Sequence, residues 1–486
     1  MSSFCSQIRA KLPGFRPGLS ALNVGRAADV LEKLNYSGPL ALSWDDTALK
    51  AAITMHAESK EVCLILGASD GVVRVTEKDD LDTLFEMAQL KKADKLCVWI
   101  LSIPLPKIPP ILIAAVAWGS STKAQELVDM HHKLADLLHE HGIHPVSLSS
   151  DGAEVERAAQ RMIADKAESC FVYAIPNSKP GCTITLEIPK YYGQHPTIIT
   201  QDSKHALKTA RNQIMTGAHL IVLGFFPVFY SMLHDLASNT LGPLFSHDVE
   251  KVDKQDDRMV ARLVSAAALE FRFKNHPDQA GLSIYLFVLG ELIDAWQNRN
   301  IFHRDRIKMM LQARFFLMVW RSHIVAHPDH NLGTHFISRE SFNIFLTICD
   351  GLLSLIIVYR NFFPTFPLLP WLHSTEACEH LFGMLRQLKK DFNYADVLNF
   401  ERKLRAFMLG AFGNLSPDEQ AAQTSAGYHH TYFAADDLDL LALMEYPTDE
   451  QLTEASKHAF EEAAQLLNLV GINAETMLKT KGRLLK

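Results

Sequence analysis

Three acidic side chains lie where they could serve phosphate-transfer chemistry. Asp45 lies in "PLALSWDD", whose alternating residues predict a strand. Asp151 ends a second predicted strand, "IHPVSLSSDG", and Glu379 lies in an amphipathic helix around "STEACEHLFGMLRQ". Carboxylates suit Mg²⁺ or Mn²⁺, and two such ions about 3.5 to 4 Å apart can assist phosphoryl transfer. We therefore predict that Asp45, Asp151 and Glu379 are the catalytic and metal-binding residues, if the fold brings these distant segments together.

Each of these acids also has a purely structural explanation. Aspartate at a strand end, as at Asp151, is commonly a turn or cap residue. Asp45 inside an apolar strand needs a partner, and Lys50 or an arginine could supply one. Glu379 lies near the start of its helix, where the helix dipole favours an acid and the polar face could be solvated. The residue types alone leave these alternatives open.

The elements that must position the acids follow from the pattern of the chain. Its 486 residues, 48% hydrophobic and 21% charged, are typical of a folded protein with two or three structural units. Strands and helices alternate after residue 39, which predicts an α/β fold, and the apolar run 110–118 predicts a central strand buried on both faces. The pattern predicts these segments: a helical lead-in at 1–38, an α/β part at 39–202, an α-helical block at 203–373, core-completing helices at 374–414 and an acidic helical tail at 415–486.

Composition limits the compartment and the partners. The formal net charge is −7, so a nucleic acid would have to bind at a local basic patch. The seven cysteines are scattered without a CxxC pair, which indicates reduced thiols in an intracellular reducing compartment. The most apolar segments are short and are interrupted by Pro227 and Asp350, so we expect buried helices and no membrane partner.

Four segments resemble P-element-type DDE transposases. They are "LSWDDTALK", "VSLSSDGAEVERA", "QDSKHALKTARN" and "STEACEHLFGMLRQ". The resemblance maps the family's metal-binding acids onto Asp45, Asp151 and Glu379, and it does not include Glu376. The third segment is similar to the one that opens the family's helical insertion, with matches at Asp202, His205, Lys208, Arg211 and Asn212.

The resemblance implies a ribonuclease-H-like mixed sheet flanked by helices and interrupted by a large all-α insertion. It implies metal-dependent DNA cleavage and strand transfer, with DNA as partner, Mg²⁺ or Mn²⁺ as cofactor and the nucleus as location. GTP is a cofactor of the family's best-known members, although this chain has no GxxxxGK[ST] loop. A homo-oligomer stays open. The family's N-terminal zinc DNA-binding module is not found here, which favours the alternative of a host-adopted or degenerate transposase-derived DNA- or protein-binding protein without catalytic activity.

Four basic residues are candidates for contact with nucleic acid. His205, Lys208 and Arg211 recur at helical spacing and could follow a row of phosphates, or they could form a solvated helix face. Arg386 follows Glu379 on its helix and could hold a DNA phosphate near the metal site. The alternative for Arg386 is that it suits the C-terminal end of the helix dipole.

Overall fold

The computed structural model describes residues 15–57, 62–69, 71–76, 91–239, 242–249, 257–401, 403 and 438–480. The start of the expected lead-in, part of the core-completing helices and much of the acidic tail therefore lie outside the described residues. The chain divides into two compact units. The first contains residues 1–168, 191–197 and 372–437, and the second contains 169–190, 198–371 and 438–486.

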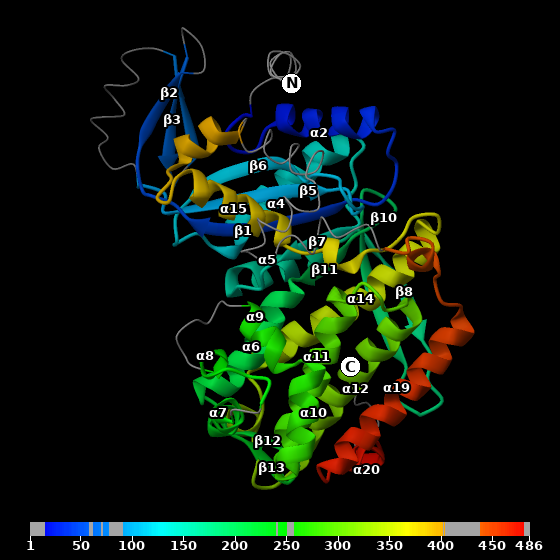
Figure 1. Cartoon of the computed structure of the whole chain (residues 1–486). Coiled ribbons are helices and arrows are strands. Elements are labelled where there is room, and N and C mark those ends of the chain that lie inside the picture. The colour runs from blue at the N-terminus through cyan, green and yellow to red at the C-terminus, as the bar shows by residue number, and fades with distance from the viewer. Residues whose placement is uncertain are drawn as a thin grey trace. The chain divides into compact units, whose positions relative to one another are not determined.

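A mixed sheet forms the centre of the first unit (Figure 1). Its strands pair in the order β7-β1-β5-β6. β1 runs parallel to β7 and antiparallel to β5, and β5 runs antiparallel to β6. The bounds are β1 Ala41–Ala48, β5 Lys95–Ser102, β6 Ile111–Trp118 and β7 Ser147–Ser150. The predicted α/β class, with a mixed sheet flanked by helices, is confirmed.

The prediction that residues 110–118 form the central strand is wrong. They form β6, which lies beyond β5 and pairs with that strand alone among the strands of this sheet. β6 is apolar because helix α2, Ala21–Lys33, packs on it, and because its outer edge is covered. The N–H of Gly18 and the hydroxyl of Tyr394 both donate to the carbonyl oxygen of Ala115. An edge strand covered in this way has the same apolar composition as a central strand.

Helices cover the two faces of this sheet. α15, Glu376–Leu388, packs against β1 and β5, and it crosses in front of these strands in Figure 1. Helix α4, Ala124–Glu140, lies on the opposite face, where the ring of its His131 contacts Trp44 of β1. α5, Glu154–Asp165, packs beside α4. Since side chains alternate along β1, Trp44 faces α4 and its neighbours face α15.

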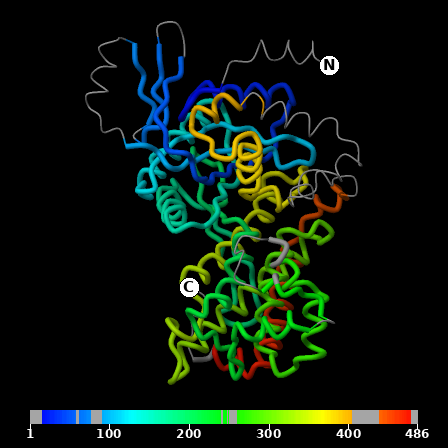
Figure 2. The backbone as a smooth tube through the Cα atoms, turned by 60° about the vertical axis from the view of Figure 1, so that its left-hand side comes forward, coloured from blue at the N-terminus to red at the C-terminus, as the bar shows by residue number. Residues whose placement is uncertain are grey.

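The sequence correctly predicted a hairpin after β1. It comprises β3, Cys63–Ala68, and β4, Gly71–Val75. A further strand, β2 Thr54–Ala57, pairs with β3 and completes a separate three-stranded sheet. This sheet is drawn in blue at the upper left of Figure 2.

The second unit is predominantly helical and has its own core. It also contains two hairpins, β8–β9 and the shorter β12–β13. Its helices of seven or more residues are α6 Ser203–Thr216, α7 Tyr230–Ser238, α9 Asp257–Leu263, α10 Ala266–Asn275, α11 Ala280–Gln297, α12 His303–Ala326, α14 Arg339–Phe362, α19 Asp449–Leu469 and α20 Ala474–Thr480. The strands are β8 Ser169–Ile175, β9 Ile184–Tyr191, β11 Ile198–Gln201, β12 Ile221–Leu223 and β13 Phe226–Val228, and β10, His195–Pro196, belongs to the first unit.

Helix α14 is long and apolar enough to cross a membrane. However, 78% of its most apolar window is buried inside the protein. Its side chains pack against α12 and α6 of the same unit. The burial fits the expectation of a core helix.

Candidate metal centre

Strand register brings Asp45 and Asp151 together. β1 and β7 run parallel, and Ser43 lies opposite Ser149. Asp45 and Asp151 each come two residues further along, so the alternation of side chains points both toward the α15 face of the sheet. Asp151 is the first residue after β7, where the chain turns toward α5. Two acids far apart in the sequence therefore reach the same end of neighbouring strands.

A third carboxylate, Glu156, joins these two. One ligand oxygen from each of Asp45, Asp151 and Glu156 lies within 4.8 Å of the other two. Glu156 belongs to the first turn of α5, and its Oε2 accepts a hydrogen bond from the Asp151 N–H at 3.1 Å. Asp45 and Glu156 are only 7% and 3% exposed. The chemistry of this all-oxygen donor set fits a hard divalent cation such as Mg²⁺ or Mn²⁺.

Glu379 lies near this cluster in the first turn of α15. Its charge contributes to the raised pKa of Asp45, after burial and after the charge of Asp151. Cys378, the preceding residue, lies 3.5 Å from the Ser43 hydroxyl through its sulfur. The structure thus brings Asp45 and Asp151 together with Glu156, whereas Glu379 acts on Asp45 through its charge and is not part of the cluster of oxygens within 4.8 Å.

The electrostatics of the site favour cation binding. Burial, followed by the charges of Asp151 and Glu379, raises the pKa of Asp45 well above 3.8. Burial, followed by the hydrogen bond to Asp151 and the charges around it, raises the pKa of Glu156 well above 4.5. Both shifts have the same two physical causes, since burial penalises the charged form of each carboxyl group and neighbouring carboxylates repel one another. A bound divalent cation would relieve that repulsion.

Asp46 has a separate role on the other face of β1. Both of its carboxylate oxygens accept hydrogen bonds from Lys95, at 2.8 and 3.0 Å. The ion pair that was a structural alternative for Asp45 is therefore formed by the next residue, Asp46. Lys50 instead donates its backbone N–H to the Phe392 carbonyl oxygen.

Arg386 is exposed near the end of β1. Its guanidinium donates a hydrogen bond to the Thr47 hydroxyl, two residues beyond Asp45 on the same face of the strand. The side chain therefore lies along the row of residues that carries the acids. Contact with a DNA phosphate stays a prediction.

The other three basic candidates lie on α6 in the second unit. Lys208 and Arg211 are buried, at 6% and 1% exposure, and His205 is partly buried. Asp202 caps this helix by accepting hydrogen bonds from the N–H groups of Lys204 and His205. In this environment Lys208 and Arg211 do not form a solvated helix face. A role for the three in phosphate binding stays a prediction, and it would require the buried side chains to become accessible.

Sequence reasoning missed Glu156. It stands five residues after Asp151 in "DGAEVERA", where a first-turn acid has an ordinary explanation in the helix dipole. The available signal was its position, because α5 begins three residues after Asp151 and its first turn carries two acids, of which Glu156 is buried and Glu154 is exposed. The burial of Glu376 was also unexpected. The sequence suggested a solvated acid in the first turn of the helix, but Glu376 is only 1% exposed.

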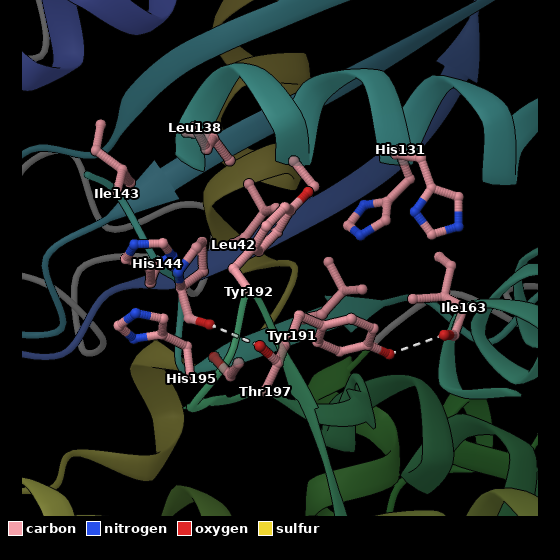
Figure 3. Close-up of a pocket in the computed structure, with 15 residues that line it drawn as sticks. Leu42, His131, Leu138, Ile143, His144, Ile163, Tyr191, Tyr192, His195 and Thr197 are labelled. Atoms are coloured by element: carbon pink, nitrogen blue, oxygen red, sulfur yellow. Dashed lines mark hydrogen bonds between the residues drawn. The ribbon is translucent and has the colours of Figure 1, made fainter. Parts of the chain in front are cut away.

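A small cavity lies elsewhere in the first unit and contains none of these acids. It measures about 60 Å³ and is bordered by α4, the start of β7 and residues 191–197. Figure 3 shows its lining side chains, among them His144 and His195, whose rings stack with centroids 3.6 Å apart. The hydroxyl of Tyr191 donates to the Ile163 carbonyl oxygen and that of Thr197 to the Pro145 carbonyl oxygen. These bonds join the segment 191–197 to the rest of the unit.

Comparison with known proteins identifies a similar fold but no similar sequence. No family model and no curated protein matches the sequence. The structure is similar to that of the protein in the "Drosophila P element transposase strand transfer complex", with a TM-score of 0.54 over 84% of this chain and 85% of that chain. The fold is P-element-transposase-like. The two sequences are only 12% identical, so the similarity is one of fold.

Proposed function

We propose that the protein is a transposase-like, metal-dependent DNA nuclease and strand transferase. The observation that carries the proposal is the approach of carboxylate oxygens of Asp45, Asp151 and Glu156 to within 4.8 Å of one another, with Glu379 close enough to raise the pKa of Asp45. The similarity of fold to a P element transposase supports it. The DNA substrate in turn implies a nuclear location.

In this proposal the acids act as a rigid holder for divalent cations. Asp45, Asp151 and Glu379 are the ligands, and Glu156 is a fourth carboxylate beside them. Bound Mg²⁺ or Mn²⁺ would supply activation of an attacking water or 3′ hydroxyl and charge stabilisation at the leaving oxygen. The protein holds the carboxylates in place: the Asp151 backbone N–H is bonded to Glu156, and Asp151 Oδ1 accepts from the Ala153 N–H at 2.7 Å. Arg386, beside Thr47, would contact the DNA backbone.

Nicking of supercoiled DNA with Mn²⁺ tests the proposal. Asp45→Asn and Glu379→Gln each remove a ligand charge, so we expect nicking to fall by at least about 100-fold in either variant. Glu140→Gln removes an exposed charge at the end of α4 and serves as the matched control, with unchanged activity. Metal-dependent nicking that is indifferent to both site substitutions would refute the assignment.

The second candidate function is DNA or protein binding without catalysis by a transposase-derived protein. The net charge of −7 favours the protein-binding form of this candidate, because the field of the whole molecule repels DNA. Retention of DNA in a binding assay, with no cleavage at any concentration of Mn²⁺, would select this candidate over the first.

A further inference from the structure

A row of polar contacts, buried except at Arg386, joins the sheet of the first unit to α15 and to the residues just before it. Ser147 Oγ lies 2.7 Å from His373 Nδ1, and Ser149 Oγ donates to the His373 carbonyl oxygen at 2.9 Å. Further along the helix, Ser43 meets Cys378, and the exposed Arg386 reaches the Thr47 hydroxyl. We call these contacts the polar seam.

Apolar packing alone does not fix the position of α15 along the strands. Leu381, Phe382 and Leu385 are buried against the sheet in a large apolar core, and hydrophobic burial is non-directional. A shifted helix could bury a similar apolar area. The seam removes this freedom, because hydrogen bonds of 2.7 to 2.9 Å are short-ranged and directional and would be broken by a shift of the helix.

The N-terminal end of the seam is the part most sensitive to displacement. Ser147, Ser149 and His373 are 0%, 1% and 1% exposed, so a shifted α15 would leave their polar atoms unpaired and out of contact with water. Each unpaired buried group costs about 1 to 3 kcal/mol. Burial also holds the pKa of His373 at about 3, so this ring stays neutral and keeps its hydrogen bond throughout the physiological pH range.

The residues of the seam and the acids lie on the same two strands, and their side chains point to the same face of the sheet. Ser43 and Ser149 are paired across β1 and β7, and each is followed two residues later by an acid of the metal cluster. On the helix, Cys378 in the seam is followed directly by Glu379. The contacts that set α15 against the strands therefore also set Glu379 against Asp45 and Asp151.

We propose that His373 is a positioning residue that, by binding Ser147 and Ser149, fixes Glu379 of α15 over the carboxylates of β1 and β7. This inference rests on the proposed metal centre. It predicts that loss of the His373–Ser147 bond weakens cation binding through Glu379. A residue that only stabilised the fold would weaken it independently of Glu379.

A double-mutant cycle with the luminescent cation Tb³⁺ tests this, since Tb³⁺ is a hard oxygen-seeking probe and needs no DNA cleavage. We expect His373→Leu and Glu379→Gln each to weaken Tb³⁺ affinity by about 10- to 100-fold. The double variant is expected to be no weaker than Glu379→Gln alone. His373→Asn, which retains a polar atom near the position of Nδ1, should recover most of the affinity.

Ser147→Ala and Ser150→Ala form a matched pair on β7. Ser147→Ala removes the partner of the imidazole and supplies the test if His373→Leu does not fold. Ser150 is 0% exposed, and its hydroxyl has no hydrogen-bond partner among the described residues, so Ser150→Ala should bind Tb³⁺ like the original protein. Additive losses of Tb³⁺ affinity in the cycle would overturn the positioning role of His373. The proposed function would still stand in that case if the unsubstituted protein bound Tb³⁺ and nicked DNA. Failure of the unsubstituted protein to bind Tb³⁺ would overturn both.

Discussion

Asp45→Asn should stabilise the metal-free protein. Asparagine keeps the shape of the side chain and an oxygen that can still accept from the Asp46 N–H, now at 2.6 Å from Asp45 Oδ1. It removes one charge from a group of carboxylate oxygens within 4.8 Å of one another. Two unit charges at that distance repel by about 3 kcal/mol at an effective dielectric constant of about 20. Because proton uptake already relieves part of this repulsion, we expect a gain in the free energy of unfolding of up to about 3 kcal/mol near neutral pH.

The pH dependence of stability independently predicts that Asp45→Asn raises the free energy of unfolding. Burial and the neighbouring acids raise the pKa of Asp45 in the folded state, so the folded protein binds this proton more tightly than the unfolded chain. Stability from this group is complete below the unfolded value and is lost as the pH rises through the folded value. Asp45→Asn should abolish that loss. Thermal denaturation in the presence of a chelator, repeated across the pH range, measures both effects.

Addition of Mn²⁺ should reverse the order of the two proteins. The original protein gains stability by binding the cation, whereas Asp45→Asn gains little. Glu140→Gln, at an exposed site, should leave the melting temperature unchanged both with chelator and with Mn²⁺. If Asp45→Asn melted lower than the original protein in chelator, or if Mn²⁺ stabilised both equally, the account of unrelieved charge in this site would be wrong.

Three further predictions concern other contacts. Gly351→Ala should destabilise the protein by about 1 to 3 kcal/mol, since the new Cβ would lie 2.6 Å from Thr200 Oγ1. Gly383→Ala should instead stabilise the protein by up to about 1 kcal/mol, since a Cβ there would have no atom within 4 Å. Urea unfolding of the two variants measures both effects. His131→Phe should flatten the acid limb of the curve of stability against pH. Burial, then the charge of His132, holds the pKa of His131 at about 3 in the folded protein. The stability that depends on the neutral ring is therefore complete above pH 6.5, the usual pKa of histidine, and falls as the pH drops, by about 2 kcal/mol at about pH 5. An unchanged acid limb would contradict this. Lys95→Met should lower stability by less than about 1 kcal/mol, because the Asp46 pair is partly exposed, and melting curves should show a smaller loss with Mn²⁺ than with chelator.

Much of the candidate site follows from local patterns. The alternation through residues 41–48 places Asp45 on the face opposite Trp44 and Asp46, whichever strands lie beside it. The apolar stripe of 376–388 marks a helix with Glu379 in its first turn. These patterns depend only on the periods of a strand and a helix, so they are visible in the sequence.

Three features depended on contacts between distant segments. Residues 95–102 form the strand between β1 and β6, although the more continuous apolar run at 110–118 suggested the centre. Lys208 and Arg211 have the spacing of a helix face but are buried by the helices around α6. Glu156 has the sequence context of an ordinary first-turn acid, and it joins the acidic cluster because α5 begins shortly after β7 ends.

The sequence by itself therefore determined which side chains share a face of each element, since that is set by backbone geometry within a few residues. Only the tertiary structure decided which faces meet. Strand order, the pairing of Ser43 with Ser149 and the position of α15 over β1 arise from packing between segments that are far apart in the chain. These long-range contacts determine how closely the carboxylates approach, and the electrostatic energy of the site depends on that distance.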